Sequence, residues 1–186
     1  LPNIFTTASG AFNVSGAPLL PIGVGVSFNL GIEDNSADAF LGRDGFSVAL
    51  RDSANANIAQ LVLTPTVGDN EVWDVAVGIG NAVPSATSAT VNASSGYIFK
   101  VDFSAGATDF SYGASGGALP NVPFATLGGV GLSGLGEIAM THNPLADEGT
   151  SANSLIFDNI SVSIPEPSSA ALLILGSAFL FGRRRS

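Results

Sequence analysis

Apolar residues at every second position are the dominant pattern of this chain, and they restrict its fold more than any other feature. Between Val24 and Ile32, valine, phenylalanine, leucine and isoleucine alternate with glycine, serine and asparagine. A period of two places the apolar side chains on one face of a β-strand, and no helical period competes with it. The same alternation predicts strands at Phe46–Leu50, Trp73–Ile79, Tyr97–Phe103 and Ile156–Ile164, and shorter ones at Ala11–Val14, Ile58–Leu63, Asp109–Tyr112 and Ile138–Thr141.

Clusters rich in glycine, asparagine, aspartate, serine and proline separate the predicted strands. About nine short strands at such spacing are typical of an all-β fold, and we expect a two-sheet antiparallel jelly-roll sandwich. No internal repeat is evident, which argues against a propeller or a β-helix. The expected connections are Glu33–Asp38, Asp52–Asn57, Thr64–Asn70, Asn81–Ser95 and a long glycine-rich segment, Gly113–Gly136.

The end of the chain has a different composition. Residues 168–182 are mostly apolar and carry no charge, and three arginines follow at 183–185. As a helix this span would reach about 22 Å, short of the ~30 Å hydrocarbon core, but arginine side chains can extend to the headgroups. Basic residues stay on the cytoplasmic side, so the preceding domain lies outside. The sequence therefore predicts a β-sandwich ectodomain at 1–164 and a short C-terminal transmembrane helix within 165–186.

A Pro-Glu-Pro turn, an apolar span and a terminal arginine cluster together resemble the PEP-CTERM sorting signal of Gram-negative bacteria, which exosortase recognises. Ile164 precedes the turn where valine is the usual residue. The resemblance implies export, anchoring in the inner membrane, cleavage near the Pro-Glu-Pro turn, and release to the cell surface or the extracellular matrix. In this interpretation the sorting and processing residues are Pro165, Glu166 and Pro167, and the membrane stop is Arg183, Arg184 and Arg185.

Charge and cysteine content exclude several classes of function. Residues 1–164 hold fourteen of the fifteen acidic residues and only three of the six basic ones. An acidic surface repels phosphate backbones, so we expect no nucleic-acid partner. The chain has no cysteine, which rules out thiol catalysis, disulfides and zinc–thiolate sites. Because the sequence begins at Leu1 and no charged segment followed by an apolar one precedes the first turn-like residues, we expect that it lacks a signal peptide that was either cleaved or truncated.

The last predicted strand is similar to the closing strand of jelly-roll carbohydrate-binding modules and other concanavalin-like sandwiches. Residues 44–48 are similar to a strand opening in lectin-like sandwiches. Asp158 interrupts the apolar face of the last strand as the alternation defines it. The resemblance implies that Asp158 is a structural Ca²⁺ ligand, because hard cations take carboxylate and carbonyl oxygens. Glu33, Asp34 and Asp38 form a further oxygen-rich loop, whereas the alternative for Asp158 is a strand-end aspartate bonded to a neighbouring loop.

Three short motifs match catalytic signatures but lack the structural context that those signatures need. Residues 113–117 match a nucleophile elbow around Ser115, and the single histidine, His142, is expected in a solvent-exposed turn. Residues 129–134 match a dinucleotide fingerprint, yet no helix is predicted after them. Glu71 and Asp74 are the nearest carboxylate pair, but they would point to opposite faces of a strand. We therefore predict no catalytic residues.

Aromatic residues are the remaining candidates for ligand binding. Trp73 shares a face with two valines, which predicts a core position and makes a sugar-stacking role the alternative. Tyr112, beside the glycine-rich segment, is a second stacking candidate. The sequence thus favours an exported, non-catalytic surface or matrix protein with exopolysaccharide as the candidate ligand and no assigned binding residues. The alternative is a secreted polysaccharide-acting enzyme, a glycoside hydrolase or a lyase, on a jelly-roll fold.

Overall fold

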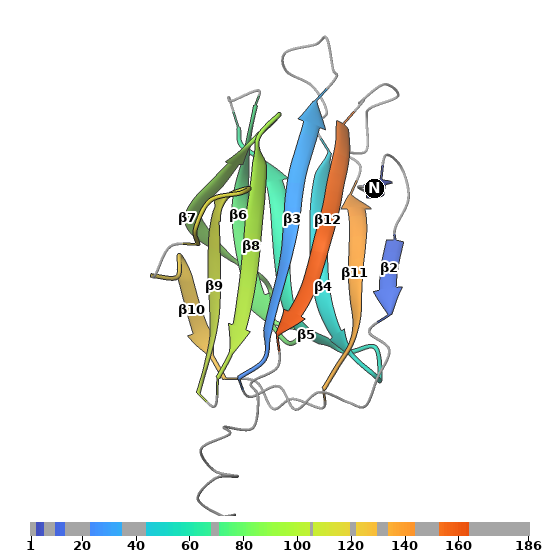
Figure 1. The fold of residues 1–186 in the computed structure, drawn as a ribbon, viewed down its shortest axis with the longest axis vertical. Coiled ribbons are helices and arrows are strands. Elements are labelled where there is room, and N and C mark those ends of the chain that lie inside the picture. The colour runs from blue at the N-terminus through green and yellow to red at the C-terminus, as the bar shows by residue number, and fades with distance from the viewer. Residues whose placement is uncertain are drawn as a thin grey trace, which may run out of the picture.

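The computed structural model is a sandwich of two antiparallel β-sheets that face each other with their strands nearly aligned (Figure 1). It describes residues 3–5, 10–13, 23–34, 44–67, 71–104, 106–119, 122–129, 134–143 and 153–163. Within these ranges there are twelve strands and no helix. The strands are β1 Asn3–Phe5, β2 Gly10–Asn13, β3 Gly25–Asp34, β4 Gly45–Asp52, β5 Asn57–Pro65, β6 Val72–Ile79, β7 Ser85–Asn92, β8 Gly96–Phe103, β9 Ala107–Ala114, β10 Ala125–Gly128, β11 Leu135–Asn143 and β12 Asn153–Ser163.

Each sheet has six strands. Sheet A has the order β1-β12-β3-β8-β9-β10, and sheet B has the order β2-β11-β4-β5-β6-β7. The first and last described strands, β1 and β12, are neighbours in sheet A, and every described pairing is antiparallel. The predicted two-sheet antiparallel sandwich is therefore confirmed. Among the described residues, no helix is long and apolar enough to cross a membrane, and residues 164–186 lie outside the described part.

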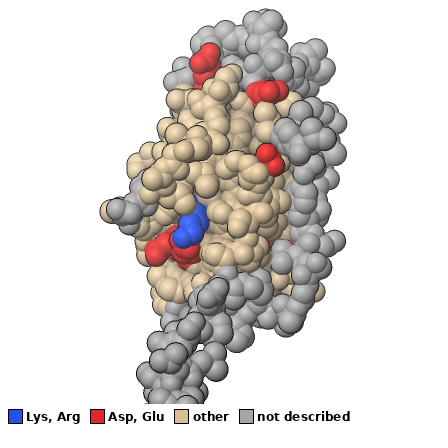
Figure 2. Space-filling model, viewed as in Figure 1, with Lys and Arg blue, Asp and Glu red and all other residues tan. Residues whose placement is uncertain are grey.

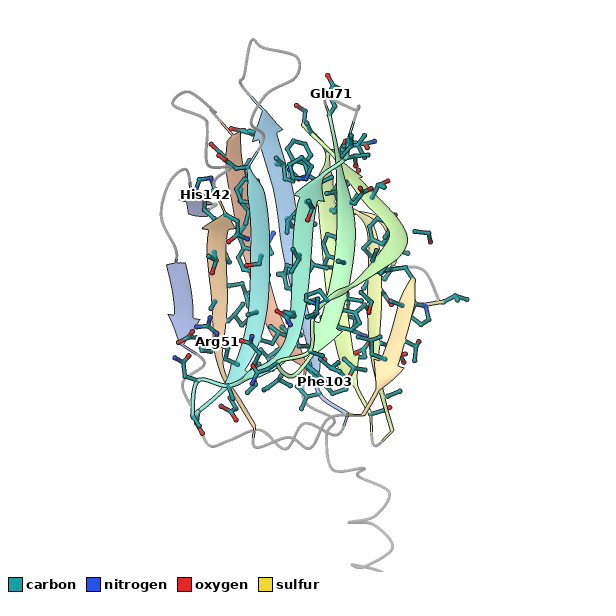
Figure 3. The ribbon with its side chains drawn as sticks, turned by 180° about the vertical axis from the view of Figure 1, so that it is seen from behind. Arg51, Glu71, Phe103 and His142 are labelled. Atoms are coloured by element: carbon teal, nitrogen blue, oxygen red, sulfur yellow. The ribbon has the colours of Figure 1, made fainter. Side chains whose placement is uncertain are left out.

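The core lies between the sheets and follows the alternation of the sequence. Phe28 of β3 stacks on Phe99 of β8 and on Phe157 of β12, with ring centroids 5.9 and 4.8 Å apart. Trp73 of β6 is fully buried, so its predicted core position is confirmed. In Figure 3, which looks at the sandwich from the side of sheet B, side chains are drawn along most of the length of the strands. Other buried side chains from the predicted strands include Val26, Leu30, Ile32, Phe46, Val48, Leu50, Leu61, Leu63, Val75, Val77, Val101, Phe103, Phe110, Ile138 and Met140.

Two predicted connections are wrong, because each contains a strand at the edge of a sheet. The segment 81–95 contains β7, and the segment 113–136 contains β10. In β7 only Ala89 and Val91 are buried, and the other positions are Ser, Thr, Ala and Asn. An edge strand contacts the core with few residues, so little apolar alternation remains in its sequence. The described part also contains β1, for which no strand was predicted.

The last strand contains a β-bulge that the alternation did not reveal. Asp158 pairs with Asn29 and Ser161 pairs with Ser27, so β12 has one residue more than β3 across this step. Asn159 takes up the irregularity with φ 52°, a left-handed conformation that asparagine tolerates better than most residues. Leu155 and Phe157 are consequently buried before the bulge, whereas Ile160 and Val162 pack against the core after it. The prediction that Asp158 interrupts the buried face is wrong, because Ile156 and Asp158 point to the outside.

Candidate functional site

A groove of about 260 Å³ lies on the outer face of sheet A, at the end where β3 finishes and β12 begins. Four chain segments surround it: the last residues of β3, the turn between β7 and β8, the end of β9, and the first half of β12. Their polar side chains come together although they are far apart in sequence. The groove is lined by Asn29, Leu30, Gly31, Ile32, Glu33, Ser94, Ser95, Gly96, Ser115, Ile156 and Asp158.

Paired glycines keep the floor of the groove open. Gly31 of β3 pairs directly with Gly96 of β8, and Gly31 also pairs with Ile156 of β12. A Cβ on Gly31 would stand 3.6 Å from the carbonyl oxygen of Ser95 and 3.8 Å from Cβ of Ile156, which is ordinary contact distance. The backbone would therefore accept an alanine at position 31, whose methyl group would occupy the floor. The floor is open because Gly31 and Gly96 have no side chains, and the backbone at Gly31 has no conformation that requires glycine.

The carboxylates of the groove differ from those elsewhere on the same face. Glu33 and Asp158 line the groove, and among the described residues neither forms an ion pair. Farther along the face, Lys100 Nζ lies 2.9 Å from Asp102 Oδ1. Figure 2 shows that most of this face is uncharged and that its basic atoms lie next to acidic ones. The groove thus has negative charge without a described counter-ion.

Asp158 has its own local hydrogen bond. The backbone N–H of Asn159, inside the bulge, donates to Asp158 Oδ1 over 2.6 Å. This bond turns the carboxylate across the outer face of β12, beside its pairing partner Asn29 on β3. The bulge therefore places a charged group at the wall of the groove.

The described residues do not by themselves make up the predicted Ca²⁺ site. Calcium takes about six to eight oxygen ligands, whereas among the described residues no three acidic or histidine side chains come together around a common point. Glu33 is exposed, Asp34 is described only as the end of β3, and Asp38 lies outside the described residues. The role of Asp158 as a metal ligand stays a prediction of the resemblance.

The prediction of a solvent-exposed turn histidine is wrong. His142 belongs to β11 and points inward near one end of the sandwich, with a side chain that is 9% exposed (Figure 3). Its Nε2 lies 2.7 Å from Oδ2 of the buried Asp44, although the angles are not those of a hydrogen bond. The indole N–H of Trp73 donates to the carbonyl oxygen of Asp44 over 3.0 Å. His142 is thus part of the buried end of the core.

The other sequence motifs do not assemble into a catalytic site. Ser115 is exposed in the turn after β9 of sheet A, whereas His142 is in sheet B, so the serine has no histidine beside it. Glu71 lies just before β6, and Asp74 is on the outer face of that strand, paired with Thr90. Residues 130–133 of the dinucleotide-like motif lie outside the described part, and β11 rather than a helix begins at Leu135.

Among the aromatic residues whose burial the structure describes, none is exposed, so these rings do not form a sugar-stacking platform. Tyr112 is half-buried, with its ring stacked on Phe99 at 5.4 Å and set edge-on to Phe124 at 5.2 Å. The hydroxyl of Tyr97 accepts a hydrogen bond from the backbone N–H of Asn92 over 3.0 Å. These rings belong to the interior, so the stacking roles considered for Trp73 and Tyr112 are not supported.

Sequence reasoning missed the groove. The available signal was the composition of the polar face of β3, where small residues occupy the outer positions from Gly25 to Gly31. A second glycine, Gly96, begins the partner strand. The groove becomes predictable only once the register is known, because it requires Gly31 and Gly96 to be directly opposite each other.

Comparisons with known proteins identify the fold and no family. No protein-family model and no curated protein matches the sequence. Among solved structures, the CBM2 module of the evolved Dit of Lactobacillus casei BL23 phage J-1 is similar, with a TM-score of 0.53 and 13% identity over 88% of this chain and 77% of that one. A tetrameric galectin from the ball sponge Cinachyrella sp. has a TM-score of 0.51 and 8% identity, over 83% of this chain and 99% of that one.

An alginate lyase from Klebsiella pneumoniae has a TM-score of 0.50 and 9% identity, over 78% of this chain and 61% of that one. At such low identity these likenesses show the fold alone. The described part of the chain is all-β, and its two-sheet sandwich is similar in fold to these three proteins. The neighbours include an alginate lyase as well as a CBM2 module and a galectin, so the fold does not decide between binding and catalysis.

Proposed function

We propose that this chain is an exported, non-catalytic surface or matrix protein that binds polysaccharide through the groove on sheet A. The observation that carries the proposal is the glycine-floored groove with hydrogen-bonding groups on its walls. The similarity in fold between this chain and a CBM2 module and a galectin supports the same proposal. At about 260 Å³ the groove is smaller than the ~300–1,000 Å³ of pockets for drug-sized ligands, which suits a short portion of a polymer that lies across an open face.

The walls of the groove offer the two kinds of contact that a sugar needs. Asn29, Ser95 and Ser115 supply donors and acceptors for hydroxyl groups, and Asp158 supplies a charged acceptor. Ile156 supplies apolar surface for the C–H face of a sugar ring. Without an aromatic platform such contacts are individually weak, so we expect a millimolar to micromolar affinity for short oligosaccharides, which corresponds to about 4–8 kcal/mol.

The arrangement of the carboxylates favours binding over glycoside hydrolysis. Glu33 and Asp158 lie on neighbouring strands, but Asp158 pairs with Asn29, four residues before Glu33. At about 3.3 Å per residue, the backbone positions of the two residues are about 13 Å apart along the strands, and side chains that project from the same face of neighbouring strands keep much of that separation. Hydrolases place their two carboxyl groups about 5–9.5 Å apart. The described residues of the groove lining include no lysine, arginine, histidine or tyrosine to act as the base of a lyase.

Binding can be tested with a glycan array and calorimetry on the 186-residue chain in mild detergent. Gly31→Ala should weaken oligosaccharide binding at least about tenfold, equal to about 1.4 kcal/mol, because its methyl group occupies the groove floor. The matched control is Gly128→Ala in β10, where an added Cβ meets nothing within 4 Å. Equal affinities of both variants would remove the groove from the binding site. Release of shortened products during incubation would instead support the enzyme alternative.

Delivery by exosortase is a separate part of the proposal, and it depends on the C-terminal tail. The Pro-Glu-Pro turn at 165–167 is the expected recognition element, and the arginines at 183–185 are the expected cytoplasmic stop. In the native cell, replacement of 165–167 by three alanines should retain the protein in the membrane, and mass spectrometry should find its C-terminus uncleaved. A variant that reaches the matrix with an unchanged mature mass would contradict the sorting proposal and leave the binding proposal intact.

A further inference from the structure

The charges around the groove are unbalanced, and this imbalance points to a class of ligand. Among the described residues that line the groove, Glu33 and Asp158 are the charged ones, and none is basic. The two basic residues of the described chain are already paired elsewhere. Arg51 Nη1 lies 3.1 Å from Glu137 Oε1, and Lys100 Nζ lies 2.9 Å from Asp102 Oδ1. In the described part of the molecule, no cation remains to neutralise the groove.

From this imbalance we infer that the groove selects polysaccharides with free amino groups, such as polymers of de-N-acetylated hexosamine, over neutral and uronic-acid polymers. The inference rests on the proposed polysaccharide binding and adds the chemical class of the sugar. A protonated amine donates hydrogen bonds and pairs with a carboxylate, whereas an N-acetyl group removes the charge. A uronic acid would add its own negative charge to those of Glu33 and Asp158. Like charges within hydrogen-bonding distance of each other repel.

The separation of the two carboxylates suits a polymer better than a single ion. The backbone positions of Glu33 and Asp158 are about 13 Å apart along the strands, and among the described residues no three acidic or histidine side chains come together as a metal ion would need. Each carboxylate can instead pair with an amine on a different sugar unit of one chain. The acidic surface of the whole domain adds long-range attraction for such a polycation. This interaction should weaken at high ionic strength, because salt screens exposed charges.

The test compares two oligosaccharides of equal length, a glucosamine hexamer and an N-acetylglucosamine hexamer, by calorimetry at pH 6. We expect the amine form to bind the 186-residue chain at least about fivefold more tightly at low salt, with most of the difference lost at 0.5 M salt, since an exposed ion pair changes affinity by about two- to fivefold. Asp158→Asn and Glu33→Gln should each lower the ratio of the affinity for the amine form to that for the N-acetyl form about two- to fivefold, because each variant keeps a hydrogen-bonding oxygen and loses the charge.

Asp74→Asn is the matched control, because it removes the same charge from an exposed position on the outer face of sheet B. It should change the preference for the amine form by less than about 1.5-fold, since charges beyond about 10 Å are largely screened at 0.1 M salt. An equal effect of Asp74→Asn and Asp158→Asn would overturn the inference, because overall charge and not the groove would then control binding. Equal binding of the two hexamers would overturn it too, while the proposed binding function would stand. Failure of both hexamers and of the whole glycan array would contradict the proposed function itself.

Discussion

The outer faces of the two sheets differ although their inner faces are alike. On sheet A, the row across β12, β3 and β8 consists of Ile156, Gly31 and Gly96, so two adjacent positions have no side chain. On sheet B, the comparable row across β11, β4, β5 and β6 consists of Thr141, Ser47, Val62 and Ala76, each with a side chain. The fold constrains only the inner faces, so the outer faces are free to differ. The hollow on sheet A is therefore the better guide to function.

The first prediction tests whether the inner faces are equivalent. Phe99 of sheet A and Phe46 of sheet B are 2% and 1% exposed, so truncation of either ring leaves a cavity in the same core. Phe99→Ala and Phe46→Ala should each lower the free energy of unfolding by about 3–5 kcal/mol. Denaturation can be followed by the fluorescence of Trp73, which is the single tryptophan and is fully buried. Ser47→Ala, beside Phe46 on the outer face, should cost less than about 0.5 kcal/mol.

A much larger loss in one sheet than in the other would contradict this equivalence. It would mean that the core side chains of one sheet contribute most of the free energy of unfolding and that those of the other sheet contribute little. The contacts argue against that outcome, because rings of three sheet A strands and side chains of sheet B belong to one continuous buried cluster.

The sequence was sufficient to predict these inner faces but not the groove. Alternation reports which residues of one strand share a face, and the burial of Phe46, Val48 and Leu50 in β4 follows it. It fails where a strand has few core contacts, as in β7, and where a bulge reverses the faces, as in β12. The groove depends on pairing between residues that are 65 positions apart, Gly31 and Gly96. Such register is a property of the assembled sheet and has no local signal.

The second prediction tests the bulge in β12 of sheet A that shapes one wall of the groove. Asn159 has φ 52°, and the left-handed region costs most residues about 1–2 kcal/mol. Asn159→Val should therefore destabilise the protein by about 1–2 kcal/mol, whereas Asn159→Gly should change stability by less than about 0.5 kcal/mol. In a regular strand the order would be reversed, because valine favours strands and glycine weakens them. Thermal denaturation distinguishes the two cases. The melting temperature of Asn159→Val should lie below that of Asn159→Gly if the bulge is present, and above it in a regular strand.

The last and smallest effect compares the ion pair on each outer face. Lys100–Asp102 on sheet A joins two side chains that are 35% and 40% exposed, and exposed pairs contribute about 0–1 kcal/mol. Arg51–Glu137 on sheet B is less exposed, at 29% and 23%, and Arg51 also donates hydrogen bonds to Asn57 and Asn55.

Because Arg51 has three partners in a fixed arrangement, Arg51→Ala should cost about 1 kcal/mol, and Lys100→Ala less than about 0.5 kcal/mol. A double-mutant cycle for each pair, measured by urea denaturation at low and high salt, separates the pair from the loss of the aliphatic stem. A coupling energy for Lys100–Asp102 that equals or exceeds that of Arg51–Glu137 would contradict the order. It would also show that the more exposed pair, on sheet A, is held more firmly than its exposure suggests, since exposed pairs have less surrounding protein to exclude water.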